Sequence, residues 1–128
     1  MLTDEEALDL VQRQVESQFP KTCAACGRSF ASLQEYLRAT VHLSTPLSID
    51  AEAGDWEPGQ PLGTMAMSNC ACGSTLAIGT KGMSLSTMWS LLNWARATSS
   101  RRGISIGQLL VDLRDKIDAR VLGAPPRP

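Results

Sequence analysis

The chain has 128 residues, 43% hydrophobic and 20% charged, a length and composition that suit one globular domain with a modest core. No apolar run reaches the roughly eighteen residues of a membrane span, and the first twenty residues are acidic and amphipathic rather than a signal peptide. The sequence therefore predicts a single cytoplasmic domain over 1–128 with no membrane contact. The net charge of −1 hides an asymmetry, because residues 81–128 carry eight bases and three acids, whereas residues 44–80 carry four acids and no base.

Residues 1–20 are expected to form an N-terminal helix. Thr3 and Glu6 have the spacing of a capping box, in which each side chain satisfies a free amide at the helix start. Apolar residues then recur every three or four positions, and Pro20 ends the pattern. The apolar positions are Leu8, Val11, Val15 and Phe19.

Residues 21–43 combine a cysteine-pair turn with a second predicted helix. Cys23 and Cys26 lie in the turn, and Ser32 with Glu35 repeats the capping spacing just after it. One helical face then carries Leu33, Tyr36, Leu37 and Val41. His42, the only histidine in the chain, is expected at the end of this helix.

Residues 44–63 are predicted to be a long acidic loop, because they hold three prolines, three glycines and four acids without a sustained period. Trp56 lies inside this loop, where an exposed aromatic ring would serve as an anchor for a partner. Residues 64–80 read instead as two short strands around Cys70, Cys72 and Gly73. They predict a hairpin with thiols at its tip.

Residues 84–123 are predicted to be a pair of helices. The first begins at Ser84 and is expected to end in the polar run from Thr98 to Gly103. The second follows Ser105, which has a capping partner at Gln108, and stops at Gly123. This second helix is amphipathic and follows a basic turn, so it is expected to contact a partner, with a homodimer through the C-terminal helices as one form of that contact.

The cysteines carry the strongest chemical signal. They occur as two close pairs, Cys23 with Cys26 and Cys70 with Cys72, and a glycine follows the second thiol of each pair. In a chain without export signals, two close pairs favour a tetrahedral metal site over a disulfide framework. Zinc is the leading metal because it favours thiolates and is held by four ligands at structural sites.

The segments at 21–30 and 68–76 resemble the broad class of zinc-ribbon and treble-clef zinc-binding modules, in which two such turns face one another. The second pair, with a single residue between its thiols, is one residue shorter than the usual spacing of that class. Residues 23–42 are also similar to the first half of a Cys-Cys-His-His finger, with Phe30 and Leu37 as its small core. This second resemblance implies that His42 joins Cys23, Cys26 and one hairpin thiol as ligands.

Several alternatives stay open at this stage. Four cysteines need only the two pairs to meet, in which case His42 lies outside the ligand set or hydrogen-bonds a thiolate. An iron–sulfur cluster would also use four thiolates, and a redox switch would join neighbouring thiols and expel the metal. With a single histidine, no nucleophile and base pair is evident, so the sequence predicts a protein that is not an enzyme.

Together these features predict an α+β fold in which a small β-hairpin is tied by a metal site to a body of about four helices. The predicted function is that of a small metal-binding accessory or regulatory protein with a structural zinc, acting by binding a macromolecule. A protein partner is favoured. A zinc-dependent DNA-binding regulator is the further alternative, resting on Arg96, Arg101 and Arg102.

Overall fold

The computed structural model describes residues 2–48 and 63–123, with backbone only at residues 44, 45, 47 and 48. Within these ranges the chain is α+β, as predicted, with four helices and two small antiparallel sheets. The elements, in chain order, are α1 (Asp4–Glu16), β1 (Lys21–Thr22), β2 (Ser29–Phe30), α2 (Leu33–Ala39), β3 (Val41–Ser48), β4 (Thr64–Asn69), β5 (Thr75–Gly79), α4 (Leu85–Arg102) and α5 (Ile106–Leu122).

The helix starts follow the capping signals in the sequence. At α1 the Thr3 hydroxyl accepts from the Glu6 amide and the Glu6 carboxylate accepts from the Thr3 amide, so both bonds of the capping box are present. Ser32 and Ser105 cap α2 and α5 in the same way through their hydroxyls. Each capping partner lies three positions after the capping residue, so the helix starts can be predicted from the sequence.

The strands form two sheets. β1 and β2 make a two-stranded hairpin, while β3, β4 and β5 form a three-stranded antiparallel sheet in that order. The β4–β5 hairpin predicted at residues 64–80 is therefore confirmed, with the cysteines in its turn. In the register of the larger sheet, His42 lies opposite Ser68 and Leu43 opposite Met67.

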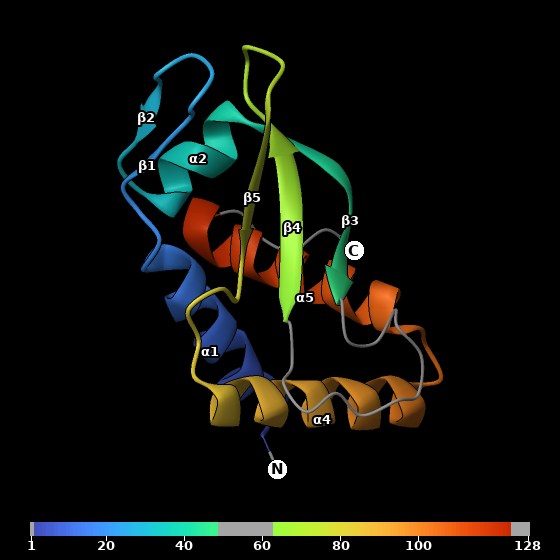
Figure 1. Ribbon diagram of the computed structural model, residues 1–128. Coiled ribbons are helices and arrows are strands. Elements are labelled where there is room, and N and C mark those ends of the chain that lie inside the picture. The colour runs from blue at the N-terminus through green and yellow to red at the C-terminus, as the bar shows by residue number, and fades with distance from the viewer. Residues whose placement is uncertain (1, 49–62, 124–128) are drawn as a thin grey trace.

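One helix, α5, covers one side of the three-stranded sheet, and the other helices lie at its edge and its ends (Figure 1). α5 runs behind the sheet, α1 lies beside it, and α4 crosses the end of the molecule away from the two cysteine turns. The β1–β2 hairpin and α2 lie next to the tip of the β4–β5 hairpin. One buried cluster joins these layers, and it comprises Ala7, Leu8, Val15, Cys23, Phe30, Leu33, Tyr36, Cys70, Trp94, Ala95, Leu109, Leu113 and Ile117.

The predicted loop at 44–63 is wrong at its beginning, because β3 continues to Ser48. Pro46 does not stop this strand, since it lies at a register irregularity between Leu43 and Leu47 on an edge strand, where its missing N–H costs no ladder bond. The rest of the predicted loop, with Trp56, lies outside the described residues.

The preceding helix also ends earlier than its apolar pattern suggested. α2 stops at Ala39, and Thr40 is already extended, with φ −123° and ψ 162°. Val41 and His42 therefore belong to β3 rather than to the helix. The strand pairing with β4 supplies partners for backbone groups that one more helical turn would otherwise have used.

α4 runs through the polar segment that was expected to end it. It reaches Arg102 and stops at Gly103. Thr98 and Ser99 point inward and are buried, so these hydroxyl residues lie on the inner face of the helix, and the Ser99 hydroxyl donates to the Arg96 carbonyl. No helix in the described part of the chain is long and apolar enough to cross a membrane.

Candidate metal centre

The first pair of thiols lies in the turn between β1 and β2. The strands pair Thr22 with Ser29, and the Cys23 amide donates to the Arg28 carbonyl at 2.8 Å. The Gly27 amide closes the turn onto the Cys23 carbonyl at 2.8 Å. Gly27 has φ +78°, a backbone conformation that residues with a Cβ adopt only at a cost. The glycine after the pair is thus required by the turn.

The second pair lies in a shorter turn between β4 and β5. Asn69 pairs with Thr75, the Cys70 amide donates to the Ser74 carbonyl at 2.9 Å, and the Gly73 amide donates to the Cys70 carbonyl at 2.9 Å. This turn closes three residues after its first cysteine, whereas the first turn closes four residues after Cys23. The second pair has one residue fewer between its thiols, which matches its tighter turn. Gly73 in this turn is again left-handed, with φ +93°.

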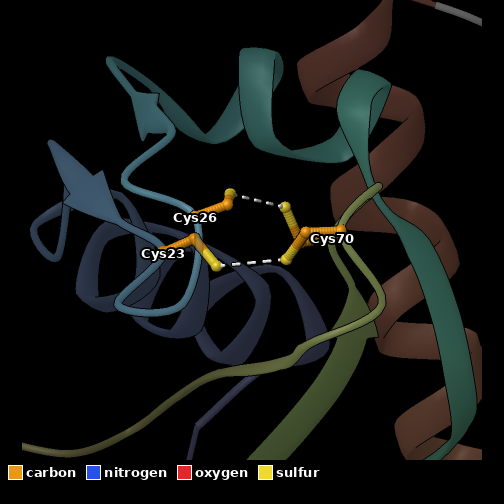
Figure 2. A group of neighbouring side chains, drawn as sticks. Cys23, Cys26 and Cys70 are labelled. Carbon is orange, nitrogen blue, oxygen red and sulfur yellow. Dashed lines mark hydrogen bonds between the residues drawn. The ribbon is translucent and has the colours of Figure 1, made fainter.

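The fold brings all four sulfurs together (Figure 2). Every Sγ of Cys23, Cys26, Cys70 and Cys72 lies within 4.8 Å of the others. The Sγ atoms of Cys23 and Cys72 are 3.7 Å apart, and those of Cys26 and Cys70 are 3.8 Å apart. A metal–sulfur bond of about 2.3 Å gives a tetrahedron with an edge of about 3.8 Å. The cluster thus has the size needed to hold one tetrahedral metal ion.

The thiols differ in how readily they lose their protons. Hydrogen bonds from the side chain and backbone of Ser74 lower the pKa of Cys72 to about 6. The pKa of Cys26 is raised to about 11, because desolvation and the neighbouring sulfurs outweigh the Arg28 backbone amide, which lowers it. The Cys72 thiolate therefore forms near neutral pH, whereas Cys26 retains its proton, which a metal ion would displace on binding.

His42 is not part of the sulfur cluster. Its Nε2 lies 2.7 Å from Oδ2 of Asp118 on α5, and its Nδ1 lies 3.3 Å from the hydroxyl of Ser68 on β4. Both ring nitrogens are thus engaged away from the thiols. Of the two ligand sets open at the level of sequence, the geometry brings together the four cysteines.

Sequence reasoning missed the hydrogen-bonded series Ser68–His42–Asp118. Its residues come from β4, β3 and α5, and 76 positions separate His42 from Asp118, so no local spacing marks it. Although it has the residue types of a hydrolytic triad, Ser68 is only 2% exposed and lies in a paired strand. In this arrangement a substrate cannot reach the hydroxyl, and the contacts join the sheet to α5.

The arginines singled out in the sequence are dispersed over α4. Arg102 forms an ion pair and hydrogen bond with Asp4 on α1, and Arg101 lies 3.8 Å from the same carboxylate. Arg96 is half-buried on the same helix. Two of the three predicted anion-binding side chains therefore contact an acidic residue of a neighbouring helix.

No family model matches this chain, and no curated protein or solved structure matches it either.

Proposed function

We propose that the four cysteines hold a structural zinc ion and that the protein acts as a small accessory or regulatory protein by binding another protein. The observation that carries the metal assignment is the match between the sulfur separations of 3.7 and 3.8 Å and the edge of a tetrahedron around one ion. In a cluster of several irons, the thiolates bind different iron atoms and spread around a larger core. The compact arrangement supports a single ion.

A structural role follows from the ligand count. Four thiolates complete a tetrahedral shell, so no position remains open for a water molecule or a substrate. The hairpin that carries the first pair has strands of only two residues each, which cannot hold a turn in place by themselves. Metal binding contributes on the order of 10 kcal/mol in zinc-finger peptides, enough to hold such a hairpin against the body.

The support for a protein partner comes from the uncovered side of the three-stranded sheet. His42 points to α5, so the alternation along β3 directs Val41 and Leu43 to the opposite side. Val41 is 73% exposed and Leu43 39% exposed. Exposed apolar side chains next to one another on a strand favour contact with another protein surface.

Metal analysis of protein purified without oxygen and without an affinity metal tests the zinc assignment. We expect one zinc per chain in a colourless sample. Cys72→Ser should lose the ion and lower the melting temperature, whereas Ala71→Ser, which places the same hydroxyl at an exposed position in the same turn, should retain both. A brown sample with iron and sulfide would replace the proposal with an iron–sulfur or thiol redox protein.

A separate experiment tests whether the protein binds DNA. To bind phosphate, Arg101 and Arg102 would first have to break their ion pairs with Asp4. Labelled duplex DNA is titrated at low salt with the unchanged protein and with the Arg101→Ala and Arg102→Ala variants. We expect that neither substitution weakens any binding that is observed. Salt-dependent binding lost in those variants would instead support a DNA-binding regulator.

A further inference from the structure

Exposure alternates around the sulfur cluster. Cys23 and Cys70 are buried, at 0% and 4% exposure, while Cys26 and Cys72 are exposed. Each exposed thiol lies beside a buried thiol of the other hairpin, Cys72 beside Cys23 at 3.7 Å and Cys26 beside Cys70 at 3.8 Å. In Figure 2 the dashed contacts run between the two turns, from Cys23 and from Cys26 to the opposite turn.

We propose that Cys72 and Cys26 are oxidation sites for hydroperoxides and that oxidation joins the two hairpins through the disulfides Cys23–Cys72 and Cys26–Cys70, releasing the metal. The metal release rests on the proposed function, whereas the pairing rests on the sulfur positions alone. The exposed member of each pair meets the oxidant, and the buried member, shielded from it, resolves the product.

The chemistry balances with hydrogen peroxide as the two-electron oxidant. The exposed thiolate attacks one peroxide oxygen, the O–O bond breaks, and hydroxide leaves, giving a sulfenic acid. The neighbouring buried thiolate then attacks that sulfur, forming the S–S bond and displacing a second hydroxide. One peroxide is thus reduced for each disulfide, and two peroxides consume all four thiolates of the chain.

Loss of two thiolates leaves the ion half of its ligands, so the first disulfide weakens the site and the second abolishes it. The sulfurs of each pair, 3.7 and 3.8 Å apart, must approach by about 1.7 Å to reach an S–S bond of about 2.05 Å. The two turns remain joined because each disulfide spans them. Oxidation therefore exchanges a metal link for a covalent link at the same place in the fold, and a thiol reductant with zinc reverses it.

The pairing can be read from one digest, because of where the basic residues lie. Trypsin cleaves after Lys21 and Arg28 and then after Arg38 and Lys81, so Cys23 and Cys26 leave in peptide 22–28 and the other two thiols in peptide 39–81. Disulfides between the hairpins link these two peptides, and disulfides within a hairpin leave them separate. Fragmentation between Cys70 and Cys72, together with fragmentation between Cys23 and Cys26, separates the two linked halves and assigns the individual pairs.

The experiment adds hydrogen peroxide stepwise to the metal-loaded chain and follows zinc with a chromogenic chelator before alkylation and digestion. We expect one zinc released for about two peroxides, linked peptides carrying the two proposed pairs, and recovery of zinc binding after reduction. Protein oxidised in denaturant is the control, since there the short loop favours Cys23–Cys26 and separate peptides.

Three results would overturn the inference while leaving the zinc site intact. The first is separate peptides from the folded protein. The second is linked peptides joined by Cys23–Cys70 and Cys26–Cys72 instead of the proposed pairs. The third is retention of zinc and of free thiols after excess peroxide. Protein that carries no metal before oxidation would refute the proposed function instead. The peptide map would still be obtained in that case, because it reports on the thiols alone.

Discussion

Replacing His42 with alanine is expected to destabilise the folded protein without removing its metal. The imidazole joins β3 to α5 through Asp118 and to β4 through Ser68, and neither contact involves a sulfur. If His42 were a ligand, as the resemblance to half of a zinc finger implied, the same change would release the ion. The variant therefore separates a packing role from a metal-binding role.

The size of the effect follows from the two contacts. A hydrogen bond involving a charged group contributes about 1.5–3 kcal/mol, and the lower end applies because 34% of the His42 side chain and 20% of the Asp118 side chain are exposed. The variant also leaves the buried Ser68 hydroxyl without this partner, which costs about 1 kcal/mol. We expect a total loss of about 2–3 kcal/mol in the free energy of unfolding.

The assay is urea unfolding at a fixed concentration of free zinc, because metal binding itself shifts the apparent stability. A double-mutant cycle with Asp118→Ala should give a coupling of about 1 kcal/mol. Asp115→Ala is the matched control, since that carboxylate lies on the same helix, is 61% exposed and pairs with its chain neighbour Arg114 at 3.4 Å. Release of zinc by His42→Ala, or a coupling no larger than the error of about 0.3 kcal/mol, would refute the packing role.

Three further outcomes are expected. The hydrogen bond from Trp94 and the nearby guanidinium of Arg102 lower the pKa of Asp4. The contribution of this carboxylate to stability is therefore present above pH 4 and is lost as the pH falls through the lowered pKa. In unfolding curves recorded over a series of pH values, Asp4→Asn should reduce the loss of stability at acid pH. Gly73→Ala should cost about 1–2 kcal/mol by backbone strain alone, since no atom lies within 4 Å of the new Cβ, and weaken zinc binding in a competition titration; unchanged affinity would contradict the role of the turn. Phe30→Ala should cost about 3–5 kcal/mol in the same unfolding assay, because its ring is fully buried beside β1; a loss under about 1 kcal/mol would show that the first hairpin is held by metal alone.

Features that depend on neighbouring residues were predictable from the sequence. The caps at Thr3, Ser32 and Ser105 each join residues three positions apart, so both partners lie close together in the sequence. The β4–β5 hairpin was likewise marked by short apolar runs on either side of its turn. The errors arose where a distant partner decides the local structure, as at β3, whose pairing with β4 ends α2 early.

The two thiol pairs, each followed by a glycine, can be recognised in the sequence, because residue types and tight turns are local properties. The way in which the thiols and His42 are brought to their partners depends on the packing of the whole fold. The sulfur contacts cross 49 and 44 positions, and the partner of His42 lies 76 positions away. Contacts of this length depend on how sheet and helices pack, and the burial of the shared core sets that packing.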